Sequence, residues 1–247
     1  MSARPPTVTT MLNDRYSLAR PAELYSYSQR VRRVVKELNA QSMYPLDPFE
    51  ICEVGCGTGK WLIDFIRWGA RGENIRGIDL KPESIEIAGS RVPGADLQVG
   101  DADRLPWPDA SCDVVLQSTV FTSILDPAKR RDIADEMVRI VKSDGLILWY
   151  DFRYDSPRNP NVRGIEKAEI RSLFPDCGIE LHRVTLAPPL ARGVVPISWI
   201  AALALEKIPL LRTHYLGVIR KRPLATGRPV VAEEALRGRR SRMRVRA

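Results

Sequence analysis

Histidine and cysteine are scarce in this chain, which has two histidines and four cysteines among 247 residues. Cys52 and Cys56 are separated by three residues, and no pair of cysteines or histidines has zinc-ligand spacing. These counts exclude a histidine-rich metal site and a disulfide-built scaffold, so we expect no metal. Reduced thiols in such numbers are typical of a cytoplasmic protein.

Long hydrophobic runs are also missing. The longest mainly apolar stretch, Ile197 to Leu205, is far shorter than the roughly 20 residues that a membrane span needs. The first residues lack the apolar core of a signal peptide. We therefore expect a cytoplasmic protein without a membrane span.

The net charge of +8 is concentrated at one end. Residues 228–247 contain seven arginines and two glutamates, a net of +5, which leaves only +3 for the rest of the chain. Arginine clusters can neutralise the phosphates of a nucleic acid or of an anionic membrane surface, so peripheral membrane contact is a further alternative. The tail has no interleaved aromatic residues, which argues against a base-stacking module. We interpret 223–247 as a basic disordered tail and the Pro/Thr-rich residues 1–16 as a disordered N-terminus.

Between these ends, strand and helix patterns alternate. A helix is expected from Pro21, with Leu24, Tyr27, Val34 and Leu38 on its apolar face. Strands are then expected at 49–54, 74–80, 95–100, 113–117 and 146–150, and helices at 61–68, 82–88 and from 127 to a stop at Gly145. This alternation predicts an α/β fold with a parallel sheet.

The C-terminal third has a different pattern. A short helix at 167–174 precedes strands at 179–186 and 214–219, and the long connection between those strands holds an apolar helix at 197–208. We predict one domain over 17–222. Its cofactor half is 49–152, and its substrate-side elements are 17–44 and 153–213.

The sharpest motif follows the first strand of the alternating region. Glu53-Val54-Gly55-Cys56-Gly57-Thr58-Gly59 lies between a strand and a helix. Glycines permit a tight turn with positive φ and let a ligand approach the backbone. This loop also occupies the carboxyl edge of a parallel sheet, where nucleotides bind.

Two acidic residues follow the next two strands. Asp79 ends the second strand of this region, where a carboxylate can accept both hydroxyls of a ribose; the alternative is a cap for the helix at Pro82. Asp101 and Ala102 end the third strand, where the carboxylate and the backbone N–H can bind an adenine ring.

These motifs, with Leu105-Pro106-Trp107-Pro108-Asp109 leading into the fourth strand, resemble the class I S-adenosylmethionine-dependent methyltransferases, type 11-like, over residues 51–152. The resemblance implies a Rossmann-like doubly wound sheet of seven strands, whose last strand, at 214–219, is antiparallel. It implies S-adenosyl-L-methionine as cofactor.

The resemblance also implies roles for single residues. Glu53 and the loop backbone of Gly55, Cys56, Gly57 and Gly59 would surround the methionine moiety. Asp79 would hold the ribose, and Asp101 with Ala102 the adenine. Leu80 and Leu105 would be the apolar walls of the adenine site, and Gln117 would contact cofactor or substrate.

A dinucleotide-binding oxidoreductase is the rival interpretation of the loop. That class prefers G-x-G-x-x-G, and Gly59 comes one residue too early for it. Glu53 would repel a pyrophosphate, whereas it would attract the ammonium of a methionine group. We therefore favour the methyl donor.

The methyl acceptor is less clearly indicated. Gln117-Ser118-Thr119-Val120 is not the Asn/Asp-Pro-Pro-aromatic motif that family members use on amino nitrogens. His214 and Asp151 are the candidates for a catalytic base, and Arg153 and Arg163 for binding an anionic or hydroxylated acceptor. The segment 149–163 is similar to a branch of the family associated with bacterial glycan and secondary-metabolite gene clusters.

The leading hypothesis is therefore methyl transfer from S-adenosylmethionine to a small molecule or saccharide, at oxygen. RNA methylation that uses the basic tail is the second hypothesis, and nucleic acid is its partner. A non-catalytic nucleotide-binding module is the third.

Overall fold

The computed structural model describes residues 17–155 and 159–222. The predicted disordered segments, 1–16 and 223–247, lie outside the described residues. Four cysteines are present in the described part, and all four are free and buried.

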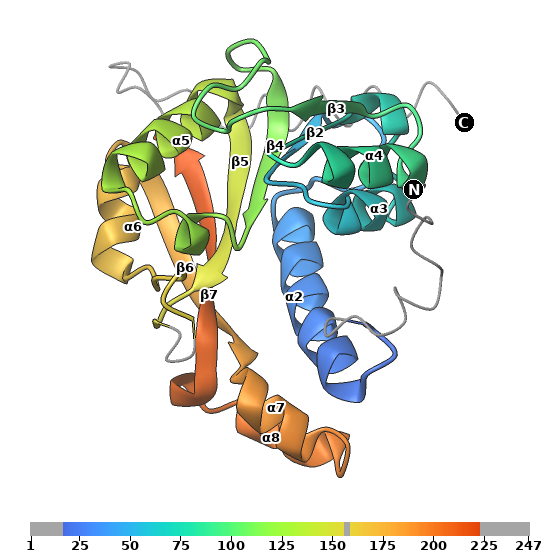
Figure 1. Cartoon of the computed structure of the whole chain (residues 1–247), viewed down its shortest axis with the longest axis vertical. Helices are drawn as coiled ribbons and strands as arrows, with labels where there is room; N and C mark the ends of the chain where they lie inside the picture. The colour runs from blue at the N-terminus through green and yellow to red at the C-terminus, as the bar shows by residue number, and fades with distance from the viewer. Residues whose placement is uncertain (1–16, 156–158, 223–247) are drawn as a thin grey trace, which may run out of the picture.

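A seven-stranded sheet forms the centre of the molecule (Figure 1). Its strand order is β3-β2-β1-β4-β5-β7-β6, and β7 runs antiparallel to both β5 and β6. The strands are β1 (Ile51–Val54), β2 (Ile75–Asp79), β3 (Asp96–Val99), β4 (Cys112–Ser118), β5 (Val141–Phe152), β6 (Cys177–Leu186) and β7 (Arg212–Lys221). The order reverses between β1 and β4, which is the point where ligands bind in open α/β sheets. This confirms the predicted Rossmann-like fold with an antiparallel last strand.

Helices cover both faces of the sheet (Figure 1). The helices are α2 (Pro21–Ala40), α3 (Lys60–Arg67), α4 (Pro82–Arg91), α5 (Pro127–Ile140), α6 (Lys167–Leu173), α7 (Pro188–Val194) and α8 (Trp199–Glu206), with 3-10 turns η1 (Gly72–Asn74), η2 (Phe121–Ser123) and η3 (Pro209–Leu211). The apolar core on one face lies under α5 and α6, and the core on the other lies under α2 and α3. Prolines begin α2, α4, α5 and α7, where the absent N–H costs no hydrogen bond.

The face that α2 buries differs from the prediction. Tyr25 and Gln29 are buried, whereas Leu24 is 40% exposed. Tyr25 packs edge-on against Trp199 of α8, with ring centroids 5.2 Å apart. The first half of α2 therefore packs on α7 and α8 as well as on β6, so its buried stripe is rotated from the one that an isolated amphipathic helix indicates.

The expected end of α5 at Gly145 is wrong. The helix ends at Ile140, and β5 begins at Val141 and includes Gly145. The register of β4 and β5 shifts between Cys112 and Val114. A Cβ on Gly145 would lie 2.7 Å from the Asp113 carbonyl oxygen, so this glycine permits close strand approach at an irregular position instead of stopping a helix.

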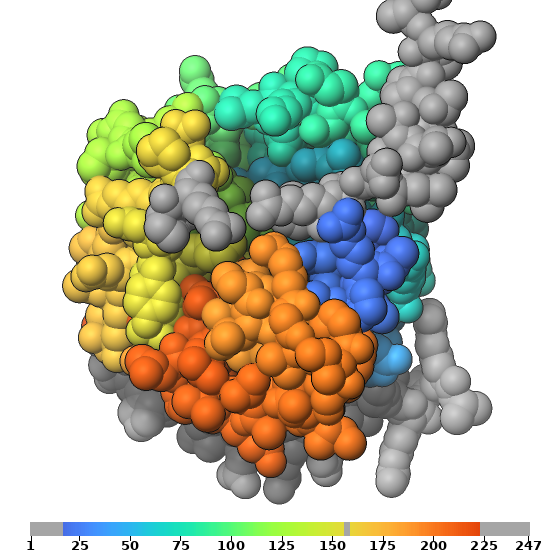
Figure 2. All heavy atoms as spheres, turned by 60° about the horizontal axis from the view of Figure 1, so that its bottom comes forward, coloured from blue at the N-terminus to red at the C-terminus, as the bar shows by residue number. Residues whose placement is uncertain are grey.

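The connection between β6 and β7 contains two helices instead of the single one predicted. Figure 2 shows this orange segment, α7 and α8, beside the blue first turns of α2. Among the described residues, no helix is both long and apolar enough to cross a membrane.

Candidate active site

The glycine loop joins β1 to α3 in a left-handed backbone conformation that favours glycine. Gly55, Gly57 and Gly59 all have positive φ. A Cβ on Gly57 would meet no atom within 4 Å, so its outer side is open to a ligand. The loop is tied to β2, because Cys56 N–H donates to the Ile78 carbonyl (2.9 Å) and Gly57 N–H donates to Asp79 Oδ2 (2.9 Å). The predicted loop residues therefore form a rigid, open cradle.

Glu53 lies at the end of β1, beside this cradle. Its side chain is buried, and its Oε2 has no hydrogen-bond partner. Burial, together with the nearby carboxylates of Asp79 and Asp64, raises the pKa of Glu53 well above its usual value. A buried carboxyl group without a partner among acidic neighbours is a site prepared for a cation.

Asp79 contributes to the structure of the loop as well as being available to a ligand. Its Oδ2 accepts from Gly57 N–H, and its Oδ1 accepts from Lys81 N–H (3.0 Å). A carboxylate oxygen has two lone pairs, so both oxygens retain acceptor capacity. Leu80, which follows it, is 63% exposed and can cover a planar ligand.

Asp101, Ala102 and Leu105 lie past β3, and the structure adds a residue that sequence reasoning missed. Lys129 of α5 makes an ion pair with Asp101 and lies 3.5 Å from Asp103. Ala102 and Leu105 are buried. The carboxylate assigned to an adenine amino group is therefore already paired with an ammonium group.

The side chain of Gln117 links the end of β4 to the backbone of β5 and to the turn that follows β4. It is fully buried; its Oε1 accepts from Val120 N–H (3.2 Å) and its Nε2 donates to the Tyr150 carbonyl (3.4 Å). Its amide groups are thus engaged with the backbone, and its predicted ligand contact stays a prediction.

A cationic and aromatic cluster was not anticipated as a unit. The Arg30 guanidinium of α2 lies 5.9 Å from the Trp61 ring centroid and 5.5 Å from that of Tyr150. Its Nε is buried without a partner. No carboxylate of the described residues pairs with it, so Arg30 supplies an available positive charge on the face of the sheet that α2 and α3 cover. Three elements far apart in sequence form this cluster, which explains why no local motif indicates it.

The two candidate bases lie on opposite faces of the sheet. In the β5–β7 ladder, Asp151 is opposite Tyr215 and Phe152 is opposite His214. His214 stacks on Tyr150 (centroids 4.8 Å apart), and burial lowers its pKa to about 3.

Asp151 accepts hydrogen bonds from the Thr122 hydroxyl (2.5 Å), from Thr122 N–H (3.2 Å) and from its own neighbour, Phe152 N–H (3.0 Å). Burial raises the pKa of Asp151 to about 6. The structure does not bring Asp151 and His214 together, so any role in proton transfer is separate for each residue.

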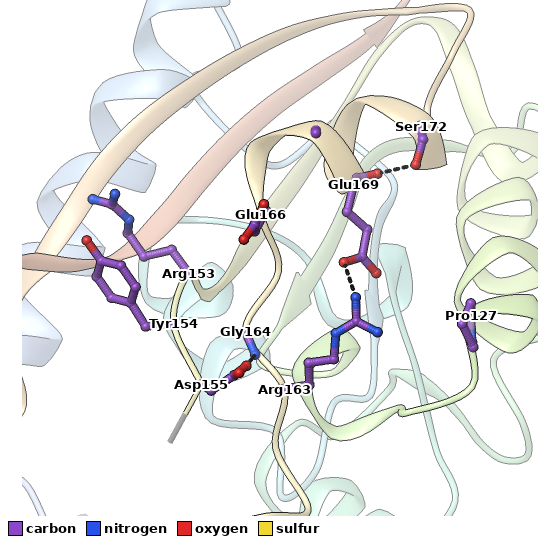
Figure 3. Close-up of a pocket in the computed structure, with 10 residues that line it drawn as sticks. Pro127, Arg153, Tyr154, Asp155, Arg163, Gly164, Glu166, Glu169 and Ser172 are labelled. Carbon is purple, nitrogen blue, oxygen red and sulfur yellow. Dashed lines mark hydrogen bonds and ion pairs between the residues drawn. The ribbon is translucent and has the colours of Figure 1, made fainter. Parts of the chain in front are cut away.

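Arg153 and Arg163 line one cavity of about 710 Å³ (Figure 3). The same cavity also contains three carboxylates, from Asp155, Glu166 and Glu169. Arg163 pairs with Glu169 at 3.2 Å, and Arg153 lies 4.5 Å from the Tyr154 ring centroid. The predicted pair shares a cavity, and that cavity carries both positive and negative side chains.

The residues present fit S-adenosylmethionine. Glu53 is an unpartnered buried acid for an ammonium group, Gly57 provides space for a ligand, and Asp79 and Asp101 end neighbouring strands at the same edge. Within 17–155 and 159–222, no cluster of His, Cys, Asp and Glu could hold a metal ion.

Comparison with known proteins gives consistent results. Residues 52–149 match a family model described as a methyltransferase domain. The chain is 29% identical over 141 residues to a probable S-adenosylmethionine-dependent methyltransferase of Mycolicibacterium smegmatis, covering 54% of this chain and 52% of that protein. It is 30% identical over 137 residues to a malonyl-[acyl-carrier protein] O-methyltransferase of Serratia marcescens, covering 54% and 50%. The chain therefore spans about half the length of these relatives.

A solved structure shares the fold. An S-adenosylmethionine-dependent methyltransferase from Archaeoglobus fulgidus aligns with a TM-score of 0.57 and 15% identity, covering 87% of this chain and 100% of that one. Residues 52–149 of this chain are therefore similar in sequence to a methyltransferase domain, and the described residues share the fold of an S-adenosylmethionine-dependent methyltransferase.

Proposed function

We propose that this protein transfers a methyl group from S-adenosylmethionine to an oxygen atom of a small molecule or saccharide. The buried, unpartnered carboxyl group of Glu53 beside the open glycine loop carries the proposal. The O-methyltransferase among the relatives supports oxygen as the acceptor atom. We place the enzyme in the cytoplasm, where its four free thiols stay reduced.

Each end of the cofactor has a complementary group in this chain. Glu53 would hold the ammonium group, and Arg30 would neutralise the carboxylate. Asp79 would accept the ribose hydroxyls, Asp101 and Ala102 would bind the adenine, and Leu80 would cover it. When bound, the cofactor supplies a methyl group on a sulfonium, which is already electrophilic. The chain's residues then need to exclude water and orient the acceptor.

A general base is needed only if the acceptor oxygen carries a proton in solution, because an ionised oxygen can attack the methyl group directly. The pKa of about 6 brings Asp151 nearer to neutral pH, where a general base is most effective, and its hydrogen bonds to Thr122 fix its position. His214 is in its neutral, proton-accepting form at neutral pH, although its pKa of about 3 makes it a weak base. We propose Asp151 as the first choice and His214 as the second.

The identity of the cofactor is tested by calorimetry. S-adenosylhomocysteine should bind the full chain with micromolar affinity and NAD should bind at least 100-fold more weakly, because Glu53 repels a pyrophosphate. A preference for NAD would overturn the proposal. Transfer of a tritiated methyl group to fractions of cell extract then distinguishes small molecules, saccharides, lipids and nucleic acid.

Replacing Asp79 with alanine should weaken binding of S-adenosylhomocysteine at least tenfold. Two ribose hydroxyls lose a charged acceptor, and each such bond is worth roughly 1.5–3 kcal/mol. The protein without ligand should also be less stable, by about 1–2 kcal/mol, because Gly57 and Lys81 lose their acceptor. Calorimetry and urea unfolding measure the two effects. Asp79→Asn, which keeps one acceptor oxygen, should recover part of the stability; full affinity in Asp79→Ala would limit this residue to a structural role.

Deleting residues 223–247 should leave cofactor affinity and turnover intact if the acceptor is small. The double variant Arg153→Ala/Arg163→Ala should instead reduce turnover at least tenfold, since both side chains line the cavity beyond β5. If the acceptor is RNA, the deletion should instead abolish turnover and the double variant should keep it. The deleted segment carries the arginine cluster, so its loss would also flatten the salt dependence of RNA binding. Filter binding at several salt concentrations and the tritium assay separate the two outcomes.

A further inference from the structure

A second cavity lies on the other side of α2 from Trp61. It has a volume of about 280 Å³ and lies between α2, β6 and the segment that leads into β7. Five cationic side chains and one carboxylate line it: Arg32, Arg33, Lys36, Arg183, Arg212 and Glu206. Neither the methyltransferase motifs nor the roles proposed above use any of these residues.

The single acid of this cavity is already neutralised. Arg32 Nη2 donates to both oxygens of Glu206, at 3.1 and 3.2 Å, and the Tyr25 hydroxyl donates to Oε2 at 2.8 Å. Arg33 Nη2 likewise pairs with Glu37 at 2.7 Å, whereas among the described residues no carboxylate pairs with Lys36, Arg183 or Arg212. The guanidinium of Arg212 donates to two backbone carbonyls, those of Glu206 and Arg183. The cavity therefore keeps a local excess of positive charge.

Two buried donors in the wall of the cavity also have no acceptor. Gln29 is 4% exposed, and its Oε1 accepts from Leu186 N–H at 3.1 Å, which fixes the amide group. Its Nε2 makes no hydrogen bond of normal geometry, although Gln29 lies close enough to Glu206 to help lower the pKa of that carboxyl, and Nε of Arg33 is also unpartnered. Buried donors of this kind are normally satisfied, so their occurrence together in a cationic cavity indicates a ligand rich in acceptor oxygens.

We propose that this cavity binds a phosphoryl group, held by Lys36, Arg183, the Arg33 Nε and the Gln29 Nε2. A phosphoryl group carries up to two negative charges and three acceptor oxygens, which matches several cations and two orphaned donors better than a carboxylate does. Its source is either a soluble phosphorylated molecule or a lipid headgroup. Exposed apolar residues of the adjoining helix α8, Ile200 and Leu203 among them, provide a surface for a lipid tail.

The cavity is coupled to the methyl-transfer side through one hydrogen bond. Thr185 lines the cavity, and its hydroxyl lies 2.9 Å from the hydroxyl of Tyr150, whose ring faces Arg30. A ligand bound here would thus contact the residue that positions Tyr150. The phosphoryl group could belong to the acceptor itself or to a separate effector, and its binding does not depend on the proposed methyl transfer.

Sodium diphosphate is the first probe, titrated into the full chain without cofactor. Calorimetry should give saturable binding, and the melting temperature should rise with diphosphate concentration. The double variant Lys36→Ala/Arg183→Ala should bind at least tenfold more weakly. The matched variant Lys167→Ala/Arg171→Ala, which removes one lysine and one arginine from the exposed face of α6, should bind like the wild type.

A second variant tests the orphaned amide. Gln29→Glu keeps the acceptor for Leu186 N–H but replaces the unpartnered donor with a carboxylate oxygen, so diphosphate binding should be lost. The melting temperature without ligand reports whether each variant folds. Binding of S-adenosylhomocysteine should stay unchanged in every variant, which separates this site from the proposed function.

Vesicles distinguish the two sources. Phosphatidylglycerol vesicles, with phosphatidylcholine vesicles as the neutral control, are sedimented with each variant. Binding of wild-type protein to phosphatidylglycerol that Lys36→Ala/Arg183→Ala removes, and diphosphate competes with, supports a lipid headgroup; binding of diphosphate alone supports a soluble ligand. The proposal is overturned if the wild type binds neither probe, or if the α6 double variant loses as much affinity as the cavity variant.

Discussion

Replacing Glu53 with glutamine should weaken the binding of S-adenosylhomocysteine by about 10- to 100-fold. A hydrogen bond to a charged group contributes about 1.5–3 kcal/mol, and each 1.4 kcal/mol is tenfold in affinity. Glutamine keeps the size of the side chain but cannot form an ion pair with the ammonium group of the ligand. Calorimetry at neutral pH measures the change, with Glu73→Gln at an exposed position as the matched control.

The same substitution should change the pH dependence of binding. The pKa of Glu53 is raised well above its usual value by burial and by the two nearby carboxylates, so the protein without ligand holds a proton there at acidic pH. An ammonium ligand requires the ionised form. Wild-type affinity should therefore fall by up to tenfold per pH unit below the raised pKa, with proton release on binding. Glu53→Gln should show neither effect; an identical pH profile in both proteins would contradict the assignment.

The stability of the ligand-free protein should depend on pH in the opposite direction: it should fall as the pH rises, whereas ligand affinity rises. A carboxyl group whose pKa is raised in the folded state stabilises the fold below its unfolded pKa, about 4.3, and loses that contribution as pH rises through the folded pKa. At neutral and alkaline pH, Glu53→Gln should therefore melt at a higher temperature than the wild type. Thermal melts at several pH values provide this measurement, and a variant that is less stable at every pH would show that Glu53 has a structural role.

Arg130→Ala should destabilise the protein by about 3–5 kcal/mol, the usual cost of removing one partner of a buried ion pair. Arg130 is fully buried; its Nη1 pairs with Glu169 at 2.5 Å, and its Nε donates to the carbonyls of Phe121 and Ile124. The substitution leaves two carbonyls without their donor and leaves Glu169 with Arg163 as its remaining ion-pair partner. It also releases the turn η2, whose Thr122 holds Asp151. Urea denaturation monitors the stability.

The apolar replacement Arg130→Met with Glu169→Leu should recover much of that loss, because it removes both charges together. Arg104→Ala, at an exposed position, should change stability by less than about 0.5 kcal/mol. If Arg130→Ala were as mild as this control, the buried ion pair would contribute little to the fold.

Local patterns predicted the first two-thirds of the fold well because each element there has its own signal. Prolines at 82 and 127 begin helices, and the glycine loop marks the junction of β1 and α3. Gly145 was misinterpreted because glycine is equally suited to ending a helix and to permitting close strand approach. Only the neighbouring Asp113 carbonyl distinguishes the two, and that contact crosses strands.

The candidate site likewise contains residues that the sequence identified and residues whose contacts it did not indicate. Residues that form the cradle, such as Gly57 and Asp79, are contiguous with strand ends and were identified from sequence. The partners of Arg30 and Lys129 were not predicted because they lie 28 or more residues away in the sequence. Arg30 contacts Trp61 and Tyr150, and Lys129 contacts Asp101. Side-chain periodicity could not indicate them either, since a charged residue on a helix is usually solvated.

The position of β7 between β5 and β6 has a consequence for how the chain folds. β5 and β6 share no ladder, so β6 cannot join the sheet until β7, which follows it in the chain, has been made. Until that moment the open side of β5, with its run of apolar residues from Leu146 to Tyr150, offers unpaired backbone groups to any other strand. Pairing of β7 with β5, before or together with β6, must therefore bridge a gap of some 60 residues, a slow, entropically costly closure. During synthesis this edge is open to pairing with strands of other chains until β7 covers it.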